Sequence, residues 1–416
     1  MKTTPIFFLL ITILFFANSC TEIKTKSNYE HVKDAKQVIV YAQEGRYAAW
    51  PANNGAFIFS GDEILVGFTE GTYKLQSGHN IDKPYTSWLA RSTDGGETWN
   101  AYDPENFVGD LGDQPELKKV EEPIDFQSSG FVMRIVGCSY HGSDDPRGHF
   151  FYSYDRGVNW NGPFSFGDLL NLPEIQKYGL GEITPRTDYV VTGTNECLVL
   201  FSARVKGEFG TDRLFCMKTV DGGQSFQFMG WVVKPFLEDE ASESFKVPLY
   251  TDESKNPYAT QCRAVMSQTF MLEDGKLLSV MRRKWAPKGA APENWVDAYA
   301  SVDGGKTWKF QSKVGDAGEG NGNPPALAVM ADGRLCAVFG ERQFGTILAA
   351  YSSDEGKTWS EPQILMDGFW SEDMELDDMG YPRVVTRSDG KMVAIFYYST
   401  KEHLHHIHAT IWDPNL

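Results

Sequence analysis

Short hydrophobic runs recur along the whole chain and are separated by residues typical of turns. Four of these runs are 36–41, 197–201, 276–280 and 391–396, and each is rich in aliphatic or aromatic side chains. Runs of this length and composition predict β-strands. No long segment has the hydrophobic spacing of an amphipathic helix. The pattern therefore predicts an all-β protein.

One eight-residue pattern occurs five times, each time directly after a strand-like run. The five segments are Ser92–Trp99, Ser153–Trp160, Thr219–Phe226, Ser301–Trp308 and Ser352–Trp359. In every segment an Asp is followed by a Gly two positions later and by an aromatic residue at the end. The carboxylate can accept hydrogen bonds from the turn, the Gly can adopt a positive φ, and the aromatic ring can pack between sheets. We therefore predict five hairpin turns whose aspartates are structural, not catalytic.

These octamers resemble the Asp-box, or BNR repeat, of sialidases and related β-propellers. The resemblance covers the whole chain after its first residues. It implies a six-bladed propeller of four-stranded antiparallel blades, with seven blades as the alternative. We expect the ring to close by pairing a strand near Val38 with the segment 405–412.

The first 20 residues have the pattern of an export signal. Lys2 precedes an apolar run at 6–17, and the small residues Ala17 and Ser19 precede Cys20. The run is too short to span a bilayer but suits a signal peptide. The segment resembles the lipobox of bacterial lipoproteins, which implies removal of residues 1–19, a lipid on Cys20, and attachment to a bacterial membrane. An ordinary secretory signal with an incidental cysteine is the alternative.

Under that interpretation, residues 20–35 form a tether and residues 36–416 form the propeller. The anchored protein would lie at the outer membrane or cell surface, or on the periplasmic side. The chain has 56 acidic and 39 basic residues and a net charge of −17, which argues against general nucleic-acid binding. We expect a monomer.

The remaining cysteines are an odd number and are widely spaced: Cys138, Cys197, Cys216, Cys262 and Cys336. We expect buried thiols instead of disulfides or a metal site. In the histidine-rich segment near the C-terminus, strand alternation places His406 and His408 on one face and His405 on the other, which does not favour a metal site. No cofactor signature occurs, and none is predicted.

The sialidase resemblance points to a candidate catalytic set. Tyr381 lies eight residues before the Asp-Gly turn at 389–390, where sialidases have a nucleophilic tyrosine. Asp82 lies upstream of the first octamer, near the place of their acid/base aspartate, and the neighbouring His79 is a second candidate for proton transfer. A half-buried core tyrosine and a loop-capping aspartate are the structural alternatives.

Arginines are the expected ligands of an acidic sugar, because a guanidinium group binds a carboxylate through two hydrogen bonds. The resemblance implies Arg46 in the first blade and Arg282 in the fourth, and Arg263 is a further substrate-binding candidate. The expected third arginine is missing from its register in the fifth blade, although Arg342 lies nearby. A second departure is Met266, which occupies the position of the glutamate that supports the sialidase tyrosine.

A different set of residues suggests β-elimination. Some propeller polysaccharide lyases use a His and a Tyr with an Arg that holds the uronate, and His141, Tyr189, Arg186 and Arg204 are the candidates here. A structural role for all of them is the alternative.

Three functions follow. The first is an exported enzyme that hydrolyses acidic glycans such as sialosides or uronosides. The second is a lyase or dehydratase acting on uronic-acid oligosaccharides. The third is a propeller that binds glycan without turnover.

Overall fold

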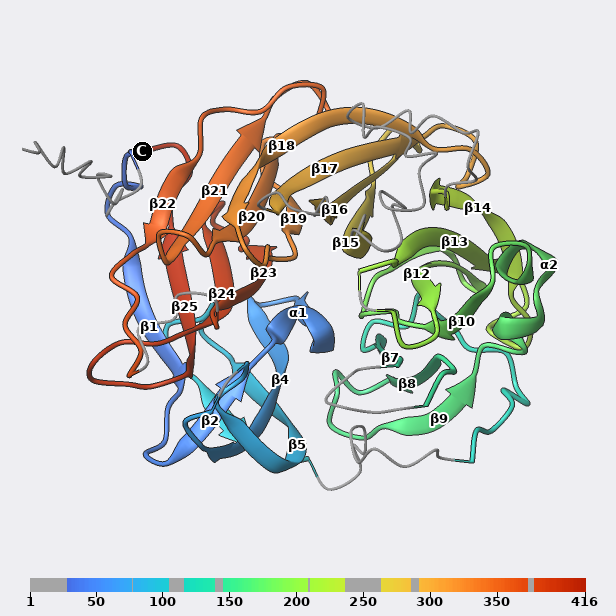
Figure 1. Cartoon of the computed structure of the whole chain (residues 1–416), viewed down its shortest axis with the longest axis horizontal. Coiled ribbons are helices and arrows are strands. Elements are labelled where there is room, and N and C mark those ends of the chain that lie inside the picture. Colours follow the sequence, from blue (N-terminus) through green and yellow to red (C-terminus); the bar gives the residue numbers. More distant parts are fainter. Residues whose placement is uncertain are drawn as a thin grey trace, which may run out of the picture.

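The computed structural model describes residues 28–76, 78–104, 116–138, 145–208, 210–235, 263–285, 292–372 and 378–416. Their strands form six sheets around a central axis, so the chain is an all-β protein with the architecture of a six-bladed β-propeller (Figure 1). This confirms the predicted fold class and selects six blades over seven.

The blades are numbered in chain order. Blade 1 contains β2 (Arg46–Ala49), β3 (Ala56–Phe59), β4 (Glu63–Tyr73), β5 (Ile81–Ser92) and β6 (Asn100–Tyr102), with α1 (Pro51–Asn54) between β2 and β3. Blade 2 contains β7 (Val132–Val136), β8 (His149–Ser153) and β9 (Asn161–Ser165). Blade 3 contains β10 (Leu180–Ile183), β11 (Tyr189–Gly193), β12 (Glu196–Val205), β13 (Arg213–Thr219) and β14 (Gln227–Val233), and is preceded by the short helices η2 (Leu169–Asn171) and α2 (Pro173–Gln176).

The second half of the ring is more regular. Blade 4 contains β15 (Arg263–Met271), β16 (Leu277–Trp285), β17 (Glu293–Ser301) and β18 (Lys309–Glu319). Blade 5 contains β19 (Ala326–Val329), β20 (Leu335–Glu341), β21 (Thr346–Ser352) and β22 (Gln363–Met366). Blade 6 contains β23 (Gly380–Thr386), β24 (Met392–Tyr398), β25 (His406–Trp412) and β1 (Lys36–Tyr41).

The N-terminal strand closes the ring. β1 pairs with β25 in the order predicted, with Val38 opposite Ala409, and the blue and red strands lie side by side in Figure 1. His406 and His408 lie on one face of β25, 3.1 Å apart between Nε2 and Nδ1, as strand alternation predicts. Residues just before β1 also attach to the propeller, because the amide of Val32 donates to the carbonyl of Ile364 in β22.

The five octamers form the predicted turns. In the fourth, the Ser301 hydroxyl and the amide of Thr307 donate to the Asp303 carboxylate at 2.8 and 2.9 Å, and the Trp308 indole donates to the carbonyl of Gly305. The indole packs among residues of the preceding blade, including Leu198. The other four aspartates accept the same pattern of serine or threonine and backbone donors: Asp94, Asp155, Asp221 and Asp354.

Blade 2 has three strands in the described part of the chain, and its inner edge is covered by the next blade. The amide of Met133 donates to the Tyr189 hydroxyl, and the amide of Ile135 donates to the Thr187 hydroxyl, both at 3.1 Å. Unpaired edge groups would otherwise be buried at a cost. Tyr189 therefore has a structural role, in place of a fourth strand.

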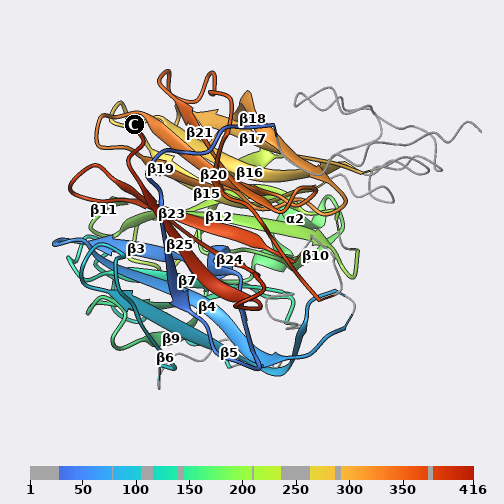
Figure 2. The same ribbon diagram turned by 90° about the vertical axis from the view of Figure 1, so that its left-hand side faces the viewer.

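The propeller has two distinct faces. β3 and β11 lie toward one face, together with the five octamer turns, and β10 and α2 lie toward the other (Figure 2). We call these the turn face and the site face. The cysteines at 138, 197, 216 and 336 are buried free thiols, as predicted, and Cys262 lies outside the described residues. No helix in the described ranges is long and apolar enough to cross a membrane.

Candidate functional site

On the site face, polar side chains lie where the innermost strand of a blade begins and where the next strand of the same blade ends. Tyr381 is the second residue of β23, Arg263 begins β15, and Arg282 lies near the end of β16. We call Tyr381, Arg263, Arg282 and Arg342 the tyrosine–arginine cluster. Its members come from blades 4, 5 and 6, so only the closed ring brings them together.

The backbone at Tyr381 is held in an uncommon conformation. Its φ is 49°, in the left-handed region that a bulky L-residue rarely adopts, and the pairing of β23 with β24 is shifted between Gly380 and Arg383. The amide of Tyr381 donates to the side chain of Asn323 at 2.9 Å. Met266 in β15 also has a positive φ of 56° at a shifted register. These irregular positions turn both side chains into the buried cluster that includes Tyr47 and Trp50.

Arginines surround the Tyr381 phenol. The Arg342 guanidinium lies 5.7 Å from the ring centre. Burial would raise the pKa of Tyr381, but the positive charges of Arg282 and Arg342, together with His79 and Arg263, lower it to about 8. The phenol therefore ionises closer to neutral pH than an ordinary tyrosine.

Arg282 is buried at 1% exposure. It donates to the side-chain oxygen of Asn321, and its Nε has no hydrogen-bond partner in the described structure. Burial, followed by repulsion from Arg263 and Arg342, lowers the pKa of Arg282 to about 9. An arginine in such surroundings is stabilised by an incoming anion, because the anion replaces the lost hydration and offsets the repulsion.

A second group, which we call the Asp378 network, lies beside this cluster. The carboxylate of Asp378 accepts hydrogen bonds from the hydroxyls of Tyr47 at 2.9 Å and Tyr397 at 3.0 Å. Nδ1 of His79 lies 2.7 Å from the same carboxylate, and Nδ1 of His405 lies 3.7 Å from it. Although burial opposes ionisation, His79, His405 and Arg342 hold the pKa of Asp378 well below its usual range.

This network gives His79 a defined orientation. With Asp378 ionised, Nδ1 of His79 carries the proton that the carboxylate accepts, so Nε2 faces away from Asp378. Burial lowers the pKa of His79, but the Asp378 and Tyr381 charges outweigh it and raise the pKa overall. The ring packs edge-on against Trp50 at 4.9 Å and keeps 43% of its side chain exposed. His79 is thus equipped to donate or accept a proton at a bound ligand.

Several of the predicted site residues are engaged elsewhere. Asp82 is exposed and paired with Lys74 at 3.1 Å, outside the tyrosine–arginine cluster. Arg46 makes a two-pronged ion pair with Glu70, so its fork already holds a carboxylate. Sequence spacing alone did not reveal either partner across the strand.

The described lyase candidates each contact partners outside the tyrosine–arginine cluster. Arg186 is buried and donates to the side chain of Asn53 at 2.7 Å. Tyr189 covers the edge of blade 2, and Arg204 pairs with Glu182 at 2.5 Å. His141 lies outside the described residues. Arg263 does reach the cluster, although its Nε also donates to Asp212 at 2.8 Å.

Sequence reasoning missed the residues that organise the site. Asp378 lies three residues before Tyr381, and Tyr47 directly follows Arg46, but neither was singled out. Arg342 does not occupy the position expected for the third arginine, yet it donates to the carbonyl of Met379 and the hydroxyl of Tyr397. A search for polar residues flanking each inner strand, in place of a fixed spacing, would have found all three.

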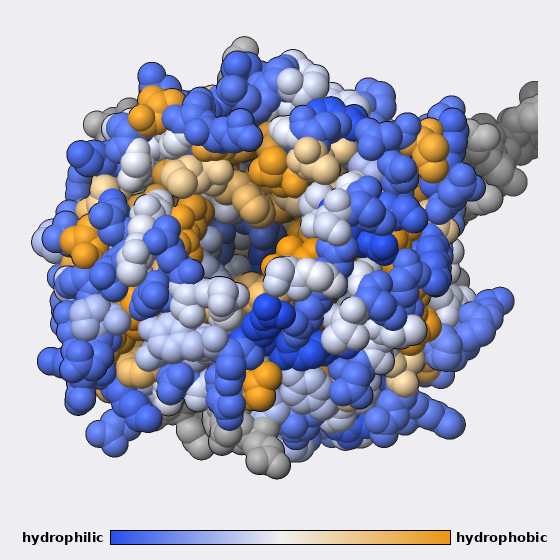
Figure 3. Space-filling view, turned by 180° about the vertical axis from the view of Figure 1, so that it is seen from behind, coloured by the Kyte–Doolittle hydropathy of each residue, from blue (hydrophilic) through white to orange (hydrophobic). Residues whose placement is uncertain are grey.

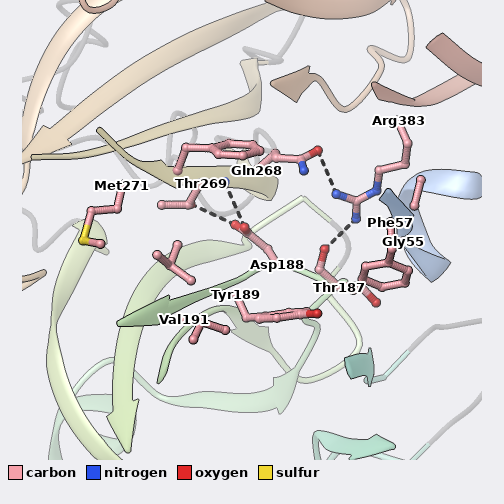
Figure 4. Close-up of a pocket in the computed structure, with 13 residues that line it drawn as sticks. Gly55, Phe57, Thr187, Asp188, Tyr189, Val191, Gln268, Thr269, Met271 and Arg383 are labelled. Atoms are coloured by element: carbon pink, nitrogen blue, oxygen red, sulfur yellow. Dashed lines mark hydrogen bonds between the residues drawn. The ribbon is translucent and has the colours of Figure 1, made fainter. Parts of the chain in front are cut away.

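The turn face carries a cavity of about 360 Å³ at the other end of the central axis. Figure 3 shows a hollow in the middle of this face with hydrophobic residues along part of its rim. Arg383 closes the inner end by donating to Gln268 at 2.8 Å and to the carbonyl of Thr187 (Figure 4). It also donates to the carbonyl of Ala52. Asp188 accepts the amide of Thr269 at 2.9 Å. These contacts join four blades, so the polar groups of this cavity hold the ring together.

No family model and no curated protein matches the chain. Solved structures do match. A protein of unknown function from Dyadobacter fermentans aligns with a TM-score of 0.60 at 15% identity, covering 91% of this chain and 99% of that one. A mutant Trypanosoma rangeli sialidase with trans-sialidase activity aligns at 0.56 and 12% identity, covering 92% and 59%. The GH93 α-L-arabinofuranosidase of Fusarium graminearum, in complex with arabinobiose, aligns at 0.51 and 13% identity, covering 91% and 98%. At these identities the likeness establishes a shared propeller fold.

Proposed function

We propose that the protein is a carbohydrate-active enzyme that hydrolyses an acidic sugar from the end of a glycan. The observation that carries the proposal is the Tyr381 phenol among three arginines, with its pKa lowered to about 8. Perturbed ionisation combined with several cations at one end of a propeller axis is typical of a working site. The sialidase and arabinofuranosidase neighbours act on glycans, which supports the same substrate class.

The proposed reaction uses the chain's own side chains. The carboxylate of the sugar binds Arg282 and Arg342, and Tyr381, which has lost its proton to solvent, attacks the anomeric carbon as a phenolate. His79 donates a proton from Nε2 to the leaving glycosidic oxygen, and Asp378 orients the ring and stabilises its charged form. Water then attacks the anomeric carbon with His79 as the base, and the phenolic oxygen leaves.

Elimination is the second candidate, and one observation favours it. Met266 occupies the position where a sialidase has the glutamate that supports its tyrosine, and it is buried at 7% exposure. Tyr381 and His79 therefore form a pair of proton-transfer groups, with Met266 in place of a carboxylate base for the phenol. In a uronic-acid chain such a pair can remove the proton next to the carboxylate and protonate the leaving oxygen, with the arginines stabilising the enolate.

One assay tests the function and separates the two reactions. Purified protein is incubated with sialosides and uronic-acid oligosaccharides, and products are followed by chromatography and ultraviolet absorbance. Release of an acidic monosaccharide without new absorbance supports hydrolysis. A product with a conjugated double bond absorbs and supports elimination. No release and no absorbance with any acidic glycan contradicts an enzymatic role and favours the glycan-binding alternative.

Export and lipid attachment belong to the same proposal. The lipobox-like segment ending at Cys20 motivates them. We expect the protein to fractionate with membranes in a bacterial host and Cys20→Ser to fractionate with soluble proteins or to stay unprocessed. A wild-type protein released in soluble form without lipid would contradict the anchor and leave an ordinary secretory signal.

A further inference from the structure

The site face has more positive charge than one sugar carboxylate requires. Arg282 and Lys284 are two residues apart on β16, so their side chains lie on the same face of the strand. Arg283, between them, faces the other way and pairs with Asp297 at 2.9 Å. Two positions along a strand span about 7 Å, so the buried Arg282 and the partly buried Lys284 form a row of that length on one face of the strand.

Lys284 has no anionic partner in the described structure. It lies directly opposite Arg263 in the pairing of β15 with β16, and opposite Asn294 in the pairing of β16 with β17. Arg263 is neutralised by Asp212, which is buried. The carboxylate of Asp378 is engaged by Tyr47, Tyr397 and His79, and that of Glu70 is engaged by Arg46.

The surroundings of Lys284 make its charge costly without a ligand. Its side chain is partly buried, and burial together with Arg282, Arg263 and Arg342 lowers its pKa to about 8. An unpaired, partly desolvated lysine beside other cations is destabilising unless an anion is brought to it. A lysine carries a compact charge at the end of a flexible stem. It can therefore bind an anionic group whose position varies from one ligand to another.

We infer that the site accepts a glycan end with two anionic groups about 7 Å apart, the first held by Arg282 and the second by Lys284. The inference rests on the proposed function and narrows its substrate class. The second group is a carboxylate or sulfate on the same or the adjacent sugar. A neutral or singly charged glycan leaves Lys284 unpaired and binds more weakly.

The test compares matched ligands by isothermal titration calorimetry. The probes are disialyl-lactose against sialyl-lactose, and a sulfated against an unsulfated uronic-acid disaccharide. Wild-type protein should bind the doubly charged member of one pair about tenfold more tightly, which is the effect of one well-placed charge pair. Lys284→Met keeps the apolar stem and should remove this preference without changing affinity for the singly charged member, and Lys284→Arg should restore most of it. Lys391→Met, on an exposed turn, is the matched control.

The outcomes separate the two proposals. Binding of singly charged sugars with no preference for the doubly charged ones overturns the second subsite and leaves the proposed function standing. An equal loss for both ligands in Lys284→Met also overturns it, because that result assigns the lysine a general role. Absence of binding by all four acidic probes overturns the inference together with the proposed function.

Discussion

The two faces of the propeller use charged side chains in opposite ways. On the turn face, each octamer aspartate bonds within its own segment, as Asp303 does with Ser301 and Thr307. On the site face, charged groups meet across blades: His79 and Asp378 are 299 positions apart in the chain. The turn carboxylates have complete sets of donors and stabilise one hairpin each. The site cations, in contrast, depend on one another and on closure of the ring, and they leave Arg282 and Lys284 without carboxylate partners in the described structure.

This difference predicts that substitutions on the two faces separate activity from stability. Substituting a charged group whose hydrogen bonds all lie within its own turn should lower the free energy of unfolding and leave kcat unchanged. Substituting a charged group that shifts the pKa of groups on other blades should lower kcat and leave stability unchanged, because bound substrate relieves the repulsion among these groups. The substitutions below test that separation in order of expected effect.

Tyr381→Phe should have the largest effect. Loss of the phenolic oxygen removes the attacking atom or the proton-transfer group, so kcat should fall on the order of a thousandfold or more. Thermal unfolding should stay close to that of wild type, because the ring packing is kept. Tyr152→Phe, in blade 2 and outside the cluster, is the control. A near-normal rate for Tyr381→Phe would end its catalytic role.

Asp378→Asn should come next. The amide no longer stabilises charged His79, so kcat should fall by about a hundredfold, at the low end of the range for acid–base groups. The pKa of His79, followed by NMR, should drop because its main charge partner is lost. A variant with low activity but an unchanged His79 titration would show that Asp378 acts through folding and not through the histidine.

On the turn face, Asp303→Ala should lower the free energy of unfolding by about 1 kcal/mol, the size of a few solvent-exposed hydrogen bonds, with kcat unchanged. The Thr307 hydroxyl outweighs burial and lowers the pKa of Asp303 to about 2. A folded pKa below the unfolded value stabilises above about pH 4. The difference between wild type and variant, measured by urea unfolding, should therefore shrink as the pH falls from about 4 toward 2. Lost activity at unchanged stability would break the contrast between the faces.

Asp82→Asn should have the smallest effect. Its carboxylate is exposed and pairs with Lys74, a contact worth little in water. We expect kcat within about twofold of wild type, and urea unfolding indistinguishable from that of wild type. A large loss of kcat would return Asp82 to the role of acid that its sequence position suggested.

The sequence determined the fold more fully than the site. The octamers carry their own hydrogen-bonding partners within a few residues, so five turns and their structural aspartates were predictable from local pattern. The closing strand pair followed from the resemblance to β-propellers. Tyr381 was predictable from its distance to the next turn. Asp378, Arg342 and Lys284 were not, because their importance arises from neighbours on other blades.

Several candidates contact partners that residue spacing does not show. Arg46 and Asp82 occupy suggestive positions in the chain, but Glu70 and Lys74 face them across a strand pair and bind them. Tyr189 was a lyase candidate, yet its hydroxyl accepts the amide of Met133 at the edge of β7. Pairing across strands and between blades decides these roles, and residue spacing does not report it.

The most direct test is an ultraviolet difference titration of wild type against Tyr381→Phe, which needs no knowledge of the substrate. The account predicts that wild type shows one additional phenolate with a midpoint near pH 8, because Arg282 and Arg342 lower the pKa of Tyr381 to about 8. If the phenol lost in the variant titrates at or above the ordinary tyrosine value of about 10, the arginines of blades 4 and 5 do not converge on Tyr381, and the proposed site does not exist.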